Sequence, residues 1–338
     1  MNVTEKVRLK AVLAKEKTDR PPVICPGGMM SAATTAVLSD FTNNFHNDPV
    51  IMTKVAERIR LNSGFENLGV PFCMTVEAEV FGSTVDLGDA GVEPCITEYG
   101  ASELAAIIAR PLPDPLTAGR APVILAAIKE LAARNQDIPI IGNITGPISL
   151  TTSIIDPLRF FRLMRKAPAE VSATLDYVTN YLVTFAQAQI AAGADVIAIA
   201  DPTATGEILG NVNFQRFVTP MLLRLVREIK NAGAGVIVHI CGDATVLLDS
   251  LQEMKGAVLS FDSIVNLPKA KVALGDIPVM GNINTQMLHT GEPQRISRNV
   301  ENLLTQGIDI IAPACGISLA TPQINLRALT TVVKRFGR

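Results

Sequence analysis

Eight short apolar runs alternate with helical patterns along this chain, and this alternation constrains the fold more than any other feature. The runs are rich in Val and Ile, which is typical of strands buried on both faces. Strands that alternate with helices form parallel sheets, and eight such units in roughly 300 residues fit a closed (β/α)8 TIM barrel. The predicted strands are residues 23–25, 69–76, 138–143, 195–201, 235–241, 257–262, 277–283 and 308–313.

Two segments stand outside this alternation. Apolar residues at helical spacing predict a lead-in helix over residues 4–17. Residues 77–94 hold three glycines among alternating side chains, which predicts a β-hairpin insertion after the second strand. An open, doubly wound sheet is the competing fold, but the chain lacks a glycine-rich dinucleotide fingerprint after a strand. We therefore expect one α/β barrel domain over residues 1–338.

Composition excludes several classes of function. The 338 residues carry a net charge of -2 and no basic run, which argues against a nucleic-acid partner. No apolar run reaches the roughly 18 residues of a membrane span, and the charged N-terminus is not a secretory signal. The five cysteines are odd in number and widely spread, which indicates free thiols in a reducing compartment. We expect a cytoplasmic protein.

Two strand ends carry soft metal ligands. His239 and Cys241 close the predicted strand 235–241, and Cys315 follows the strand 308–313. Residues i and i+2 of a strand point to the same side, so His239 and Cys241 share one face. Because carboxyl ends of barrel strands meet at one mouth, we predict that all three side chains hold a zinc ion, which favours Cys and His. A cysteine at a strand end is often only a buried apolar side chain, so core packing remains the alternative.

Other strand ends also finish in polar side chains. Asp262 ends the strand 257–262 and is a candidate fourth, exchangeable zinc ligand. Asp201 and Asn282 end two further strands, and both are candidate substrate-binding residues. For Asp201, capping the loop that follows is an equal alternative.

The remaining cysteines, histidines and hairpin carboxylates are assigned no chemistry. We expect Cys25, Cys73 and Cys95 to pack in the core, because each lacks a neighbouring ligand in the sequence. His46 and His289 lie at predicted loop or helix-start positions, so we expect both to face solvent. We also expect Glu77 and Glu79 to face solvent, because they lie at the predicted hairpin.

The chain resembles the uroporphyrinogen-decarboxylase-like superfamily and, within it, the methylcobamide:coenzyme M methyltransferases of methanogenic archaea. The likeness covers essentially the whole chain. Its segments are Asp19-Arg20-Pro21-Pro22-Val23, residues 192–202, His239-Ile240-Cys241-Gly242, Gly281-Asn282-Ile283 and residues 312–317. The lead-in and barrel segments mark the superfamily, whereas the His-x-Cys pair and the distal Cys mark its zinc-dependent, thiol-alkylating members.

The resemblance implies both the reaction and its partners. A methyl group would pass from a methylcobamide on a separate corrinoid protein to the thiol of coenzyme M (2-mercaptoethanesulfonate), in methanogenesis from methanol or methylamines. The family's zinc ligands fall on His239, Cys241 and Cys315. Asp262 departs from the Glu of relatives. The corrinoid would supply the demanding chemistry, and zinc would make the thiol a thiolate.

Three other functions remain open at this stage. A zinc methyltransferase could serve homocysteine or another thiol, and the ligand set does not exclude it. A metal-free porphyrinogen decarboxylase would need arginines after the first strand, where the chain has Pro26-Gly27-Gly28-Met29-Met30. A corrinoid carrier would need an Asp-x-His-x-x-Gly loop, and the sequence contains none.

Overall fold

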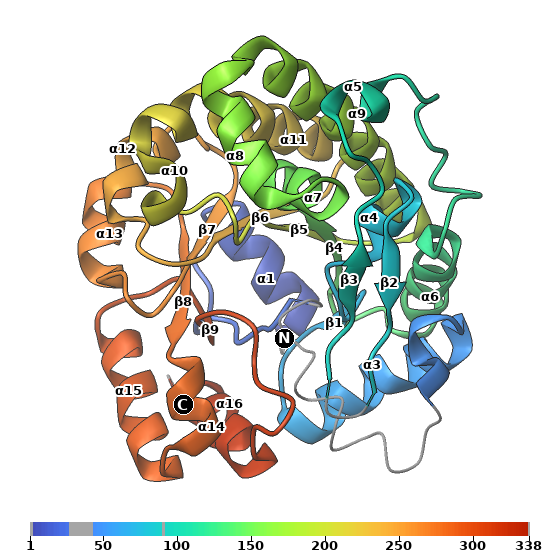
Figure 1. Cartoon of the computed structure of the whole chain (residues 1–338). Coiled ribbons are helices and arrows are strands. Elements are labelled where there is room, and N and C mark those ends of the chain that lie inside the picture. The colour runs from blue at the N-terminus through green and yellow to red at the C-terminus, as the bar shows by residue number, and fades with distance from the viewer. Residues whose placement is uncertain (1–2, 27–42, 90–91, 337–338) are drawn as a thin grey trace.

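The computed structural model describes residues 3–26, 43–89 and 92–336. Seven parallel strands form the main sheet, in the order β1-β4-β5-β6-β7-β8-β9. Figure 1 looks along the curled sheet, with helices around its outside and α1 visible through its centre. The strands are β1 (Leu68–Val70), β4 (Ile140–Thr145), β5 (Val196–Ala200), β6 (Gly235–Ile240), β7 (Val258–Phe261), β8 (Val279–Ile283) and β9 (Ile310–Pro313).

The predicted first strand closes the sheet into a barrel. Val23 forms a parallel bridge with Ile311 of β9, and its carbonyl accepts a hydrogen bond from the Glu66 amide just before β1. The Glu66 carboxylate in turn accepts a hydrogen bond from the Val23 amide, at 3.1 Å, and forms an ion pair with Arg20. The expected α/β barrel is confirmed, with this segment as the eighth member of the ring.

Period-two alternation fills the inside of the barrel. Ile141, Ile237, Val258 and Ile310 face inward and form one buried cluster, and Leu9 of α1 (Glu5–Leu13) packs against them from below. The alternate residues of the same strands face outward and pack under the helices. The predicted lead-in helix therefore closes the amino end of the barrel, which leaves the carboxyl end free for a site.

Helices follow most strands and cover the outside of the barrel (Figure 1). The outer helices are α3 (Pro49–Ser63), α6 (Ala121–Arg134), α9 (Pro168–Ala192), α11 (Thr219–Asn231), α13 (Leu267–Leu274), α15 (Pro293–Thr305) and α16 (Gln323–Arg335). Shorter elements in the connecting loops are η3 (Asn43–His46), α4 (Val76–Val80), α5 (Leu104–Ile108), α7 (Pro147–Ile154), α8 (Pro157–Lys166), α10 (Gly206–Asn213), η4 (Phe214–Val218), η5 (Thr245–Leu247), α12 (Leu248–Leu251) and α14 (Thr285–Thr290).

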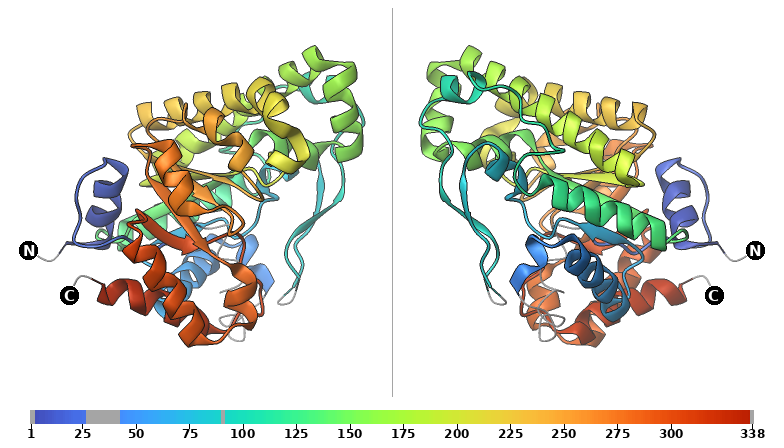
Figure 2. Two further views of the ribbon diagram at one scale, coloured as in Figure 1. Left: turned by 90° about the vertical axis from the view of Figure 1, so that its left-hand side faces the viewer. Right: turned by 90° about the vertical axis from the view of Figure 1, so that its right-hand side faces the viewer.

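The segment after β1 differs in its boundaries from the prediction. β1 ends at Val70, because Pro71 has no amide hydrogen to continue the ladder. Residues 76–80 form the helix α4 instead of the first arm of a hairpin. The hairpin itself exists, as antiparallel strands β2 (Thr84–Asp86) and β3 (Cys95–Glu98). Figure 2 shows it at the end of the molecule opposite α1 and the two termini.

Candidate functional site

The mouth of the barrel is floored by a layer of small and polar side chains. Parallel register aligns Ala200 with His239, and His239 with Ser260. His239 and Cys241 continue the inward face that begins with Ile237, as the two-residue period requires. Since Ala200 and Ser260 are small, a cavity remains above this layer.

The structure brings the three predicted soft ligands together. His239 Nε2 lies 3.0 Å from the Sγ of Cys241, which lies 3.1 Å from the Sγ of Cys315. All three ligand atoms lie within 4.8 Å of one another. On the other side of the imidazole ring, Nδ1 lies 3.0 Å from the Ser260 hydroxyl oxygen. If that oxygen accepts from Nδ1–H, the Nε2 lone pair faces the two thiols.

The two thiols do not titrate independently. The hydrogen bond from Cys241 lowers the pKa of Cys315, while the same bond and burial raise the pKa of Cys241. The pair thus shares one proton, as two acids in contact do. A divalent cation between the two sulfurs would favour the loss of this shared proton, because the cation compensates the negative charges of both thiolates.

This donor set fits zinc. A tetrahedral zinc ion with ordinary bond lengths holds neighbouring Cys and His ligand atoms roughly 3.4–3.8 Å apart. The observed separations of 3.0 and 3.1 Å reach those values with shifts of a few tenths of an ångström. The His–Ser hydrogen bond supplies the outer contact that orients a metal-binding imidazole. Three protein ligands leave the fourth position for a substrate.

Asp262, the predicted fourth ligand, lies outside the group of three. Its carboxylate accepts bonds from the Gly242 amide at 3.3 Å and from Ser263 and Ile264 in its own loop. Asp262 therefore holds the turn that follows Cys241, at the point where Gly242 adopts a positive φ of 67°. In this arrangement the carboxylate orients the loop that follows Cys241.

The two candidate substrate-binding residues also make internal bonds. Asp201 is fully buried and accepts hydrogen bonds from the amides of Ile148 and Ser149 at the start of α7. Burial raises the pKa of Asp201 to about 6, although those hydrogen bonds act to lower it. Its side chain therefore caps the start of α7, which follows β4, and not the loop after Asp201 that the capping alternative named. Asn282 donates to the carbonyls of Asp262 and Val265, so it braces the loop after β7.

A cavity of about 210 Å³ opens beside the three ligands. None of the described residues that line it is Lys or Arg. The lining residues are Pro26, Phe72, Cys73, Met74, Glu93, Pro94, Asn143, Ala198, Ile199, Ala200, Pro202, Ile237, His239, Cys241, Ser260, Met280, Cys315 and Gly316. Sequence reasoning missed the contribution of Ser260 and of Cys73, since neither lies near a ligand in sequence.

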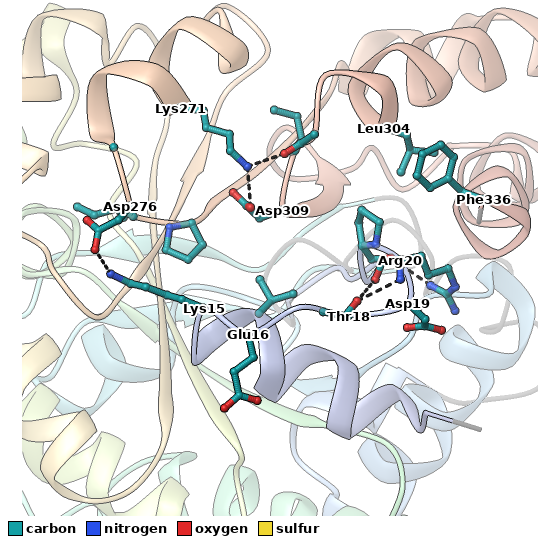
Figure 3. Close-up of a pocket in the computed structure, with 17 residues that line it drawn as sticks. Lys15, Glu16, Thr18, Asp19, Arg20, Lys271, Asp276, Leu304, Asp309 and Phe336 are labelled. Atoms are coloured by element: carbon teal, nitrogen blue, oxygen red, sulfur yellow. Dashed lines mark hydrogen bonds and ion pairs between the residues drawn. The ribbon is translucent and has the colours of Figure 1, made fainter. Parts of the chain in front are cut away.

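A second hollow, of about 510 Å³, lies at the opposite end of the barrel, where the strands begin (Figure 3). Both of its lysines are paired with aspartates of the same hollow. Lys15 pairs with Asp276, and Lys271 pairs with Asp309. The ligand-bearing cavity at the carboxyl end of the strands is therefore the candidate active site, as in other barrels of this kind.

Three expectations about isolated residues were wrong. His46 is buried, with 3% of its surface exposed, because Phe45 and neighbouring loops cover it. Cys95 is exposed, since it lies in the projecting hairpin strand β3. Glu77 is buried in α4 and accepts bonds from the amide and hydroxyl of Thr145. Cys25 and Cys73 are buried as expected.

Comparison with known proteins decides the family. The family model for uroporphyrinogen decarboxylase (URO-D) matches residues 4–336. The chain belongs to this family. The uroporphyrinogen decarboxylase of Geotalea uraniireducens is 31% identical over 174 residues, 49% of this chain and 50% of that protein.

Similarity over the whole chain points to the methyltransferases of the family. The methylcobamide:CoM methyltransferase MtbA of Methanosarcina acetivorans is 30% identical over 98% of both chains. The corresponding protein MtaA of Methanosarcina barkeri is 30% identical over 96% of both. A solved methyltransferase from Methanosarcina mazei has a TM-score of 0.92 at 29% identity, with both chains fully covered. These matches support a methyltransferase. Among the described helices, none is long and apolar enough to cross a membrane.

Proposed function

We propose that this chain transfers a methyl group from methylcobamide to the thiol of coenzyme M, with a zinc ion held by His239, Cys241 and Cys315. One observation carries the proposal: the imidazole and two sulfurs lie within 4.8 Å of one another on the wall of a cavity at the barrel mouth. The names of the whole-length relatives support the donor and acceptor.

The ligand set suits activation of a thiol. Zinc bound there would keep the acceptor sulfur deprotonated at neutral pH. One neutral imidazole and two thiolates balance the charge of a divalent cation, so the acceptor sulfur keeps its electron density. The rest of the chain binds and orients the thiol and excludes water. In the transfer, the acceptor sulfur gains the methyl group, and the cobalt keeps the electron pair of the broken bond, going from Co(III) to Co(I).

The donor requires a partner. We propose that a separate corrinoid protein presents the methylcobamide at the barrel mouth, in methanogenesis from methanol or methylamines. We also propose a cytoplasmic location, which the five free cysteines support.

Ligand variants test the proposal. We expect purified protein to hold about one zinc per chain and to methylate coenzyme M when given methylcobalamin. His239→Ala and Cys241→Ala should remove both properties, while circular dichroism shows an intact fold. Cys95→Ala, an exposed cysteine outside the site, is the matched control and should behave as wild type. A His239→Ala, Cys241→Ala double variant that turned over at the wild-type rate would refute the mechanism.

Two other functions give different results. A zinc methyltransferase for homocysteine would show the same metal dependence with another preferred acceptor, which a panel of thiols reveals. A metal-free porphyrinogen decarboxylase needs basic side chains for a polyanionic substrate. The described lining of the cavity contains no Lys or Arg, which favours the methyltransferase.

A further inference from the structure

The acceptor thiol needs a second point of attachment besides its sulfur, and this inference rests on the proposed function. Coenzyme M ends in a sulfonate, which favours a cationic or hydrogen-bonding partner. The described lining of the cavity has no Lys or Arg. The nearest structural clue is Arg120, which lies behind the lining residue Cys73.

Arg120 points at Cys73 from the start of α6. Its side chain is buried, with 5% of the residue exposed. The Nε atom donates to Glu79, so part of the charge is compensated from that side. The two terminal nitrogens meet weaker partners: Nη1 lies 3.6 Å from Cys73 Sγ, and Nη2 lies 2.8 Å from the Thr75 hydroxyl. A thiol is a poor acceptor for a buried guanidinium, so this end of Arg120 would gain from a better one.

The position of Cys73 connects this guanidinium to the site. Phe72, Cys73 and Met74 form one wall of the cavity, and Cys241 and Cys315 line the same cavity. The same cavity therefore reaches both the candidate metal ligands and the Cys73 wall. Cys73 both lines the cavity and contacts Arg120, with its Sγ 3.6 Å from Nη1, so an anion in the cavity would bind the terminal nitrogens in place of this thiol.

His46 provides a second, independent observation. It is 3% exposed, and its Nδ1 atom has no hydrogen-bond partner among the residues that the structure describes. Burial, and then the charge of Arg120, lower its pKa to about 4, so the ring is neutral at pH 7 and lies in the field of that guanidinium. It borders a small hollow whose walls include Phe72 and Glu93, which also line the cavity. The structure therefore holds two buried polar groups, on α6 and η3, beside the same wall.

We propose that Arg120 binds the anionic tail of the acceptor, at the wall formed by Cys73 and Thr75, and so selects short thiols that end in a sulfonate. The bond would be charge-assisted and made by the two terminal nitrogens, which match a pair of anionic oxygens. In this arrangement Arg120 contacts substrate directly, and Glu79 holds its other edge in place.

Two acceptors that differ in their tails test this assignment. Coenzyme M and 2-mercaptoethanol share the thiol and the two carbons, but only the first is charged at its far end. Arg120→Gln should raise the KM for coenzyme M by about 10- to 100-fold and leave that for 2-mercaptoethanol nearly unchanged. Arg110→Gln is the matched control, because Arg110 donates to the backbone carbonyls of Phe81 and Gly100 at the base of the hairpin. It should change neither KM.

A binding measurement separates this inference from the proposed function. Ethanesulfonate has the tail without the thiol, and ligand-observed NMR reports its binding without turnover. Wild type should bind it and Arg120→Gln should not. If Arg120→Gln fails to fold, Cys73→Asp gives the same test, since the new carboxylate occupies the guanidinium and should abolish ethanesulfonate binding.

The outcomes are distinct. Equal losses with both thiols in a folded Arg120→Gln variant, or absence of ethanesulfonate binding by wild type, would overturn the role of Arg120. Wild-type protein that methylates no thiol, yet binds ethanesulfonate through Arg120, would overturn the proposed function and leave the anion site standing.

Discussion

Ser260→Ala tests whether the hydrogen bond behind the His239 imidazole strengthens zinc binding at the proposed metal site. Ser260 lies on β7, opposite His239 in the register, and is 1% exposed. Its hydroxyl oxygen lies 3.0 Å from His239 Nδ1. Alanine removes only that oxygen, so the strand and the three ligands stay in place.

The size of the effect follows from what the ring loses. Loss of an outer hydrogen bond to a metal-binding histidine typically weakens metal affinity about 10- to 100-fold, or about 1.4–2.7 kcal/mol. A buried N–H left without an acceptor costs about 1–3 kcal/mol, which is the same range. The ring can relieve that cost by moving its proton to Nε2, but it then ceases to be a ligand. Either route predicts zinc binding that is 10- to 100-fold weaker.

Competition with a chromophoric chelator at pH 7 measures the zinc affinity, and thermal unfolding of the metal-free protein measures stability. Ser250→Ala is the matched control. Ser250 lies on α12 outside the barrel, is equally buried, and donates a hydrogen bond to Asn211 at 2.9 Å. Both variants should lose similar stability, and only Ser260→Ala should lose zinc. A zinc affinity within twofold of wild type for Ser260→Ala, or an equal loss in Ser250→Ala, would refute the reasoning.

Three further predictions concern the scaffold. Burial raises the pKa of Glu77 from 4.5 to about 7, so its contribution to stability is complete below about pH 4.5 and is lost as the pH rises through 7. Glu77→Gln should therefore make the free energy of unfolding depend less on pH between pH 5 and 8. An unchanged slope would contradict this prediction. Gly146→Ala places a Cβ 2.3 Å from that of Asp201 and should cost about 1–3 kcal/mol in urea unfolding, whereas an unshifted midpoint would show that the turn relaxes. Glu66→Gln leaves Arg20 without its buried partner carboxylate and should lower the free energy of unfolding by about 3–5 kcal/mol. A loss of stability below about 1 kcal/mol would show that water replaces the ion pair.

Local rules were enough to predict that the three candidate zinc ligands lie together. The two-residue period places His239 and Cys241 on one face, and the shared direction of parallel strands brings Cys315 to the same mouth. The alternation of strands and helices likewise predicted the barrel, because each apolar run must be covered on both faces. The same rules predicted a hairpin, but they set its start in the wrong place, since α4 precedes it.

Those local rules did not predict contacts between side chains on segments that are far apart in the sequence. Ser260 meets His239 only through the register of β6 and β7, and Asp262 turns to the Gly242 amide only because the loop after β6 comes within 3.3 Å of it. Arg120 reaches Cys73 across 47 positions of chain. A sequence determines which way a side chain faces and where its strand ends, since both depend on neighbouring backbone angles. The partner that a side chain meets depends on how distant segments pack, and only closure of the barrel decides that.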